Sequence, residues 1–305
     1  MNKKIPVILD VDTGIDDGVA IIMAAKCPKL DIKLVVTCHG NTTIKNITKN
    51  TLFILEKLKR FDIPVAEGMA SPLLIKRPHV SAHGADGMGG YEYENPGFDI
   101  LKESALEATH RILSSSDEKF TYICLAPSTN VAKLIKKYPQ DVDKIKELVI
   151  MVGSNEPVKE GEVPYKEFNA SVDPEALDLV LSSNLKKTIV SMEMGHTAYL
   201  NWKDVYKTEK TNAFGEMLEN IFRGYKDYHV RNGIATHDGC AAAYVIDPSI
   251  FETKPAHMQV KYFEKLGSGV GVIDYEEKPN VTVTTKVDVK KFKKLYFKTL
   301  KKCKI

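Results

Sequence analysis

One stretch near the N-terminus, IPVILDVDTGIDDG at residues 5–18, constrains the fold of this chain most strongly. Its apolar run from Ile5 to Leu9 predicts a buried β-strand. Four carboxylates follow within eight positions, at Asp10, Asp12, Asp16 and Asp17. The first two share one face of an extended strand, and the last two open a helical pattern over residues 19–25. Gly14 permits a sharp turn between them, so the stretch predicts a strand, a turn and a helix with the acids gathered at the turn.

Such a cluster of acids favours a metal site. Close like charges raise each other's pKa unless a proton or a cation lies between them, and a hard cation with oxygen ligands, Ca²⁺ or Mg²⁺, relieves the repulsion. Asp also caps helices, so one or two of the four have a structural reading. An aspartate-nucleophile phosphohydrolase also begins with a strand and Asp-x-Asp, but it places Thr two positions after the second Asp. Here Thr13 follows Asp12 directly, which weakens that alternative and leaves it open.

The composition excludes several classes of protein. The 305 residues carry a net charge of +3, which is too small to indicate nucleic-acid binding. The five cysteines are scattered without a CxxC spacing, which argues against a disulfide framework or a zinc site. We expect Cys38, Cys124 and Cys240 to be buried thiols. A strand begins at once and no apolar run reaches the length of a membrane span, so we expect no signal peptide, no membrane contact and a cytoplasmic setting.

Strand-like and helix-like patterns alternate about seven times along the chain. This predicts a single α/β domain over residues 1–305, with a mostly parallel, Rossmann-like sheet and helices on both faces. The predicted strands of the sheet are residues 5–9, 32–38, 64–66, 120–125, 148–152 and 187–192. We expect two further, edge-like strands at residues 257–263 and 281–285. A long amphipathic helix is predicted over residues 212–230 and a last helix over residues 289–300.

Ligands of such sheets bind at the carboxyl ends of the strands. Several polar or loop segments follow the predicted strands. We expect them to gather at one edge of the sheet: the acidic cluster, Asn41, Leu125, the loop after Met151, and Asp238. A long Gly- and Pro-rich segment, residues 67–99, contains His79, His83, Asp86 and Tyr91. A loop of this length is either functional or disordered; its side chains favour a substrate-covering loop, and a floppy insertion is the alternative.

At this point the chain resembles the inosine–uridine-preferring nucleoside hydrolase family over nearly its whole length. ILDVDTGIDD matches the family's N-terminal calcium signature, DxDxGxDD, with Thr13 where many members have Pro. The later motifs follow in the family's order: HGN at 39–41, HGADGMG at 83–89, LAPSTNVA at 125–132, EFNASVDPEA at 167–176 and HDGCAAAYVIDP at 237–248. The last motif has Gly239 in place of Pro.

The resemblance implies a role for each matching residue. Calcium ligands would be Asp12, Asp17, the Leu125 carbonyl and Asp238, with Asp10 in support. Ribose would contact Asp16, Asn41, Met151, Glu167 and Asn169. His237 would contact the leaving base, His83 would be a second active-site histidine, and Tyr225 and His229 would lie near the base on one helix face. We interpret His39, His110, His196 and His257 as structural or surface residues. The resemblance also implies a homodimer or homotetramer.

The implied reaction is calcium-dependent hydrolysis of the N-glycosidic bond of nucleosides to free base and ribose. Asp12 would act as the general base on a metal-bound water and His237 would assist the departing base. The phosphohydrolase alternative needs a basic phosphate cradle, and Lys is not placed at the predicted strand ends. A non-catalytic nucleoside- or ribose-binding protein would be favoured by a damaged acidic cluster, but the cluster is intact. The loop around Glu162 lacks the Asn with which many members hold the 5′-hydroxyl.

Overall fold

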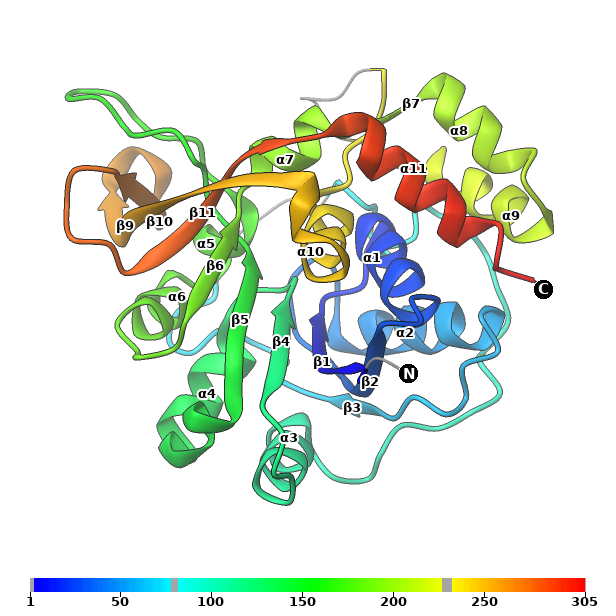
Figure 1. Ribbon diagram of the computed structural model, residues 1–305, viewed down its shortest axis with the longest axis horizontal. Coiled ribbons are helices and arrows are strands. Elements are labelled where there is room, and N and C mark those ends of the chain that lie inside the picture. The colour runs from blue at the N-terminus through cyan, green and yellow to red at the C-terminus, as the bar shows by residue number, and fades with distance from the viewer. Residues whose placement is uncertain (1–2, 78–81, 227–231, 305) are drawn as a thin grey trace.

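A nine-stranded sheet with helices on both faces forms the centre of the molecule (Figure 1). The computed structural model describes residues 3–77, 82–226 and 232–304. The order across the sheet is β10-β9-β11-β6-β5-β4-β1-β2-β3. These strands are β1 (Ile5–Val11), β2 (Leu30–Thr37), β3 (Val65–Glu67), β4 (Phe120–Cys124), β5 (Ile145–Met151), β6 (Lys187–Val190), β9 (Phe251–Phe263), β10 (Ser268–Asp274) and β11 (Val281–Val287). A separate two-stranded pair is formed by β7 (Leu200–Asn201) and β8 (Gly233–Ile234).

The helices follow the strands in the alternation that the sequence predicts. They are α1 (Ile15–Ala25), α2 (Ile44–Lys57), α3 (Ala105–Ser114), α4 (Thr129–Lys137), α5 (Phe168–Val172), α6 (Pro174–Leu181), α7 (Met192–Thr197), α8 (Trp202–Glu209), α9 (Ala213–Phe222), α10 (His237–Ile246) and α11 (Val289–Leu300). None of the helices among the described residues is long and apolar enough to span a membrane.

The sheet is parallel from β3 through β11, which confirms the predicted fold class. The prediction that residues 281–285 form an edge strand is wrong, because β11 lies inside the sheet between β6 and β9. Residues 257–263 are the second half of β9, which pairs antiparallel with an unpredicted edge strand, β10. Strand β10 has the sequence SGVGVID, and its glycines disfavour strand structure, which explains why the pattern was missed.

The alternation of β1 divides the core into two layers. Val7 and Leu9 face one layer, which contains apolar side chains of α1, α2, α10 and α11. Ile8 faces the other layer, with side chains of α3, α4 and α6. All three of these β1 side chains are fully buried. Strand β1 is therefore covered on both faces, and its carboxyl end is fixed inside the sheet between β4 and β2.

The long helix predicted over residues 212–230 ends early. Helix α9 stops at Phe222, Arg223 is its C-cap, and Tyr225 therefore lies beyond the helix. Gly224 follows, and a Cβ there would lie 2.3 Å from the Cα of Gly89. This close approach lets the segment after residue 82 pack onto the end of α9. The predicted helix face shared by Tyr225 and His229 is wrong for Tyr225, and His229 lies outside the described residues, as does His79.

The described part of the long Gly-rich segment is fixed to α2 by one buried side chain. The Asn50 side-chain amide donates to the carbonyl oxygens of Thr13 (3.0 Å) and Asp86 (2.9 Å). The Tyr93 hydroxyl contacts the other end of the same amide, and its ring stacks on Phe53 with 4.0 Å between centroids. Asn50 therefore joins the turn after β1 to the segment that carries His83.

We expect Asn50→Ala to lower the free energy of unfolding by about 1–3 kcal/mol, because two buried carbonyl groups lose their donor. Urea denaturation measures the difference. The matched control is Asn46→Ala on the same helix, whose half-buried amide donates to the Thr42 hydroxyl (3.2 Å), and it should change stability by less than about 0.5 kcal/mol. Equal denaturation midpoints for the two variants would contradict the anchoring role of Asn50.

Candidate active site

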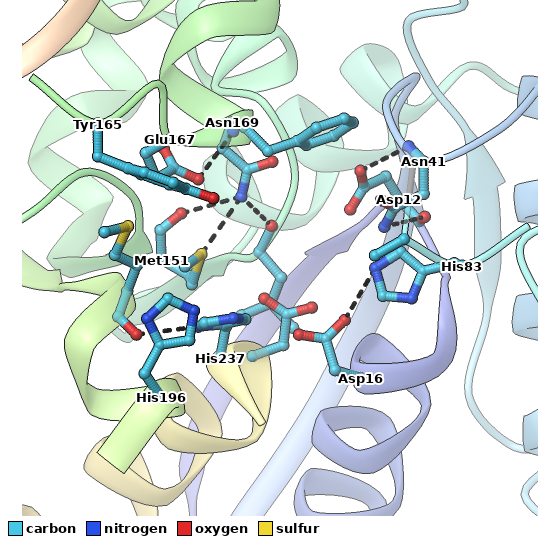
Figure 2. A pocket seen from close by; sticks show the side chains of 15 residues that line it. Asp12, Asp16, Asn41, His83, Met151, Tyr165, Glu167, Asn169, His196 and His237 are labelled. Atoms are coloured by element: carbon cyan, nitrogen blue, oxygen red, sulfur yellow. Dashed lines mark hydrogen bonds and ion pairs between the residues drawn. The ribbon is translucent and has the colours of Figure 1, made fainter. Parts of the chain in front are cut away.

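A pocket opens at the carboxyl ends of the parallel strands, where the sequence places the site (Figure 2). It is lined by most of the predicted site residues: Asp12, Asp16, Asn41, His83, Leu125, Met151, Glu167, Asn169, His237 and Asp238. It is also lined by five residues that were not predicted: Ala82, Tyr165, Phe168, Met192 and His196. Segments distant in the sequence therefore converge on one site.

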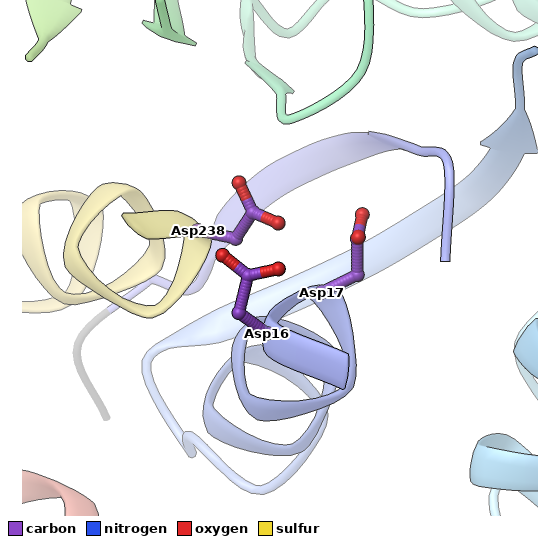
Figure 3. A group of neighbouring side chains, drawn as sticks. All are labelled: Asp16, Asp17 and Asp238. Atoms are coloured by element: carbon purple, nitrogen blue, oxygen red, sulfur yellow. The ribbon is translucent and has the colours of Figure 1, made fainter. Parts of the chain in front are cut away.

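Three carboxylates converge beside this pocket (Figure 3). Asp16 and Asp17 come from the first turn of α1 and Asp238 from the first turn of α10, and one oxygen atom of each lies within 4.8 Å of the others. All three residues are buried. Burial, together with the charge of Asp16, raises the pKa of Asp17 to about 7, and the same two causes raise that of Asp238 well above its usual value. No Lys or Arg is among the described residues that line the pocket. The donor set fits a hard divalent cation.

Asp12 lies next to this group and is held by Asn41. The Asn41 backbone N–H donates to Asp12 Oδ2 (2.9 Å), and its side-chain amide donates to the Asp12 carbonyl (3.2 Å). Burial and the neighbouring charge of Asp17 raise the pKa of Asp12. Gly40 makes the contact possible, because a Cβ there would lie 1.9 Å from Asp12 Oδ2. The resemblance implies that Asp12 binds the metal and that Asp16 contacts ribose. In the structure, the three clustered carboxylates are those of Asp16, Asp17 and Asp238, and Asp12 lies next to them.

Two of the acids also have structural roles. Asp17 accepts hydrogen bonds from the backbone N–H groups of Asp12 (3.2 Å) and Gly14 (2.9 Å) and so caps α1. Asp10 does not line the pocket. It is fully buried and accepts from the Tyr122 hydroxyl (3.0 Å) and the Asn130 amide (2.9 Å), and burial raises its pKa to about 7. The Asp10 side chain, predicted to support the metal site, therefore faces Tyr122 of β4 and Asn130 of α4.

A second wall is built from β5 and the start of α5. The Asn169 amide donates to the carbonyl oxygens of Leu125 (2.6 Å) and Met151 (3.0 Å), which ties two strand ends together. Glu167 caps α5 by accepting from backbone N–H groups, and burial raises its pKa. Glu162 is exposed and does not line the pocket. Tyr165, from the same loop, does line it and lies beside Asn169 in Figure 2.

Backbone groups fix the protonated nitrogen of each active-site histidine. The Ile15 N–H donates to His83 Nδ1 (3.1 Å), so the ring proton is on Nε2, which lies 3.5 Å from Asp16 Oδ1. His237 Nδ1 lies 3.1 Å from the Met192 carbonyl oxygen. Because a carbonyl only accepts, this nitrogen carries the proton. The two histidines lie on different sides of the pocket (Figure 2).

His196 corrects one prediction. We interpreted it as structural or surface, but it lines the pocket, and its ring is 4.8 Å from that of His237 at an angle of 75°. The sequence pattern extended β6 to Met192, whereas the strand ends at Val190 and α7 begins at Met192. The signal that could have identified His196 is the short helix α7, which follows the carboxyl end of β6. Tyr225 does not line the pocket, although its ring lies 5.3 Å from that of His83.

A model of the inosine-uridine preferring nucleoside hydrolase family matches residues 7–294. The chain belongs to this family. It is 33% identical over 298 residues to a non-specific ribonucleoside hydrolase, RihC of Salmonella newport, with 96% of each chain covered. The structure of a plant nucleoside hydrolase, PpNRh1, has a TM-score of 0.87 at 27% identity and covers 97% of this chain. A purine-preferring ribonucleoside hydrolase from Gardnerella vaginalis has the same TM-score at 24% identity, and this likeness shows the fold alone.

Membership of the nucleoside hydrolase family confirms the predicted class of enzyme and accounts for the position of the acids. The family's N-terminal signature supplies Asp16 and Asp17, and its C-terminal HD motif supplies Asp238, which α1 and α10 bring together. Carboxylates in such an arrangement can hold a cation and stabilise positive charge on a substrate. His237, on the far side of the pocket, offers ring nitrogens that can donate or accept a hydrogen bond.

For the metal-free nucleoside hydrolase we expect stability to fall as pH rises. The folded-state pKa values of Asp10 and Asp17 are about 7, against an ordinary value of 3.8. The folded state therefore holds more protons between these limits, so the free energy of unfolding decreases from about pH 4 to pH 7 and then levels off. Urea midpoints in chelator and in Ca²⁺ measure this. A divalent cation bound at the cluster should raise the midpoint most above about pH 7, and identical curves with and without Ca²⁺ would show that Ca²⁺ does not bind there.

Proposed function

We propose that this chain hydrolyses the N-glycosidic bond of ribonucleosides to a free base and ribose with the help of Ca²⁺. One observation carries the proposal: two carboxylates of the buried acidic cluster, Asp16 and Asp238, line the same pocket as a histidine of fixed tautomer, and Asp17 lies next to them. The chain's family and its similarity to a protein named as a non-specific ribonucleoside hydrolase support the substrate class.

The residues proposed to hold Ca²⁺ are Asp12, Asp17, the Leu125 carbonyl and Asp238, and Asp16 lies close enough to support them. When bound, Ca²⁺ would orient a water and lower its pKa. Asp12 would accept the proton of the attacking water, because it is the pocket-lining carboxylate held in place by the Asn41 backbone N–H. Asp16 and Asn41 would bind the ribose hydroxyls, and the nearby carboxylates would stabilise the oxocarbenium-like sugar.

The opposite wall would serve the other end of the substrate. Met151 packs beside the sugar, and Glu167 and Asn169 hold its far side. As the imidazolium, His237 would deliver its Nε2 proton to the departing base and keep its Nδ1 proton on the Met192 carbonyl oxygen. His83 points its Nε2–H at Asp16, so we place His83 on the sugar side of the pocket rather than at the base.

The two alternatives are less well supported. A phosphohydrolase needs a cationic cradle, and the described lining of the pocket contains no Lys or Arg. A non-catalytic binding protein would have no use for a cluster of carboxylates whose mutual repulsion costs stability. The single catalytic domain, the homodimer or homotetramer and the cytoplasmic setting predicted from the sequence stay predictions.

The decisive experiment compares two substrates. Inosine has a poor leaving group and needs His237, whereas p-nitrophenyl riboside releases a phenolate that leaves unaided. His237→Ala should slow inosine cleavage by about 10²-fold or more and scarcely affect the nitrophenyl substrate. Asp12→Ala should abolish both reactions. The measurement is kcat for each substrate, with circular dichroism as the folding test.

The matched control is His257→Ala. This histidine lies on β9 and pairs with Glu277, so both rates should be unchanged. Elemental analysis should find one Ca²⁺ per wild-type chain and less in Asp17→Ala. Active protein without a divalent metal would overturn the metal-dependent mechanism. Equal losses on both substrates in His237→Ala would show that another residue assists the leaving base.

A further prediction concerns the 5′-hydroxyl. Tyr165 and Glu162 are both exposed, but only Tyr165 of the two lines the pocket, near Asn169. We expect Tyr165→Phe to raise the activation free energy of inosine cleavage by about 1 kcal/mol, the value of one hydrogen bond. The rate of 5′-deoxyinosine cleavage should be unchanged. Glu162→Gln is the control and should change neither. A penalty for 5′-deoxyinosine above about 3 kcal/mol in the wild type would indicate a stronger grip than one tyrosine supplies.

A further inference from the structure

Helix α7 lies very close to the start of α10 at Gly195. A Cβ on this residue would lie 2.3 Å from His237 Nδ1 and 2.7 Å from both Cγ and Cα of the same histidine. Ordinary van der Waals contact begins at 3.4 Å. Any side chain at position 195 would therefore have to move the imidazole ring, the start of α10, or α7 itself, by about 1 Å.

The space left by Gly195 is used by a hydrogen bond. With α7 this close, the Met192 carbonyl oxygen lies 3.1 Å from His237 Nδ1 and fixes the proton on that nitrogen. The lone pair or second proton is then on Nε2. His196, one residue after Gly195, packs edge-on against the His237 ring, with 4.8 Å between centroids. One turn of α7 thus sets both the tautomer and the orientation of His237.

Helix α7 is itself anchored and resists displacement. The hydroxyl of Ser154 donates to Glu193 Oε1 (2.6 Å), and the backbone N–H of Asn155 donates to Glu193 Oε2 (3.1 Å). The Met192 N–H donates to the Gly153 carbonyl (3.0 Å). These contacts join α7 to the segment that follows β5, so the strain of an added methyl group falls on the His237 side of the contact.

We propose that Gly195 is a positioning residue for His237. Its missing side chain lets α7 hold the imidazole by the Met192 carbonyl, so that Nε2 meets the leaving base. This inference rests on the proposed role of His237 in base departure. The competing explanation is that Gly195 only allows α7 and α10 to pack, in which case its replacement would disturb Asp238 and the whole site equally.

The test is Gly195→Ala assayed with both substrates. A displacement of about 1 Å at a catalytic group costs on the order of 10²-fold in rate, so inosine cleavage should fall by that factor. p-Nitrophenyl riboside should lose less than about threefold, and the Ca²⁺ content should be unchanged. A similar loss on both substrates, or a loss of Ca²⁺, would overturn the proposal in favour of general packing.

The control is Gly215→Ala, which crowds a helix contact away from the pocket. A Cβ there would lie 1.9 Å from the Thr208 carbonyl oxygen, between α8 and α9. This variant should lose thermal stability, and the ratio of its two rates should stay at the wild-type value. A change in that ratio equal to that of Gly195→Ala would show that the ratio reports crowding in general, and would overturn the proposal.

A double variant, Gly195→Ala with His237→Ala, keeps the test valid if the single variant folds poorly. Removing the ring removes two of the three close contacts, so the second substitution should recover part of the thermal stability lost in Gly195→Ala. On inosine the double variant should be no slower than His237→Ala alone. Absence of recovery, or fully additive rate losses, would overturn the proposal.

The two proposals fail in different ways. If His237→Ala alone slows both substrates equally, the proposed role of His237 is wrong. If His237→Ala is selective for inosine and Gly195→Ala is not, the role of His237 stands and that of Gly195 is wrong.

Discussion

Repulsion among buried carboxylates is the constraint on which the rest of this structure depends. Asp12, Asp16, Asp17 and Asp238 are nearly inaccessible to solvent, and charges in such a place destabilise one another unless a proton, a cation or N–H donors compensate. The protein supplies backbone N–H groups from Asn41 to Asp12 and from Gly14, the N-cap of α1, to Asp17. One oxygen atom each of Asp16, Asp17 and Asp238 still lies within 4.8 Å of the others. The parallel sheet gathers the carboxyl ends of strands that are distant in sequence at one edge, where these acids meet.

A second constraint is the hydrogen bond that a backbone group makes with each pocket histidine. His83 lies on the side of the acids and His237 on the opposite side, and in each case a backbone group determines which ring nitrogen carries the proton. The Ile15 N–H donates to Nδ1 of His83, so the ring's own proton is on Nε2 and faces Asp16, whereas the Met192 carbonyl oxygen accepts from Nδ1 of His237. Backbone groups have fixed donor or acceptor character, so the two histidines cannot exchange roles by a change of tautomer. Two identical side chains, those of His83 and His237, thereby differ in which ring nitrogen carries the proton because their backbone partners differ.

The parts of the fold that local sequence determines were predictable. Strand β1, the last helix over residues 289–300 and the buried thiols follow from apolar runs, helical periodicity and composition, and the structure confirms them. The missed parts are those in which tertiary contacts override local pattern. Strand β10 is held by pairing with β9 despite its glycines, and α7 is a short helix that looks like the continuation of β6. His196 and Tyr165 were missed because loops and short helices bring them to the pocket, and no sequence spacing encodes that approach.

The acidic cluster also links stability to function. A cation that binds only the folded state adds RT ln(1 + [L]/Kd) to the free energy of unfolding, about 2.7 kcal/mol at a hundredfold excess over Kd. The carboxylates that would bind the cation lower the stability of the metal-free chain, because they are buried and repel one another. Replacing these acids would raise the free energy of unfolding of the metal-free chain, whereas the proposed catalysis requires them. A bound cation would therefore offset the repulsion that the cluster creates, and β1, buried between the two core layers, holds Asp10 and Asp12 in place against that repulsion.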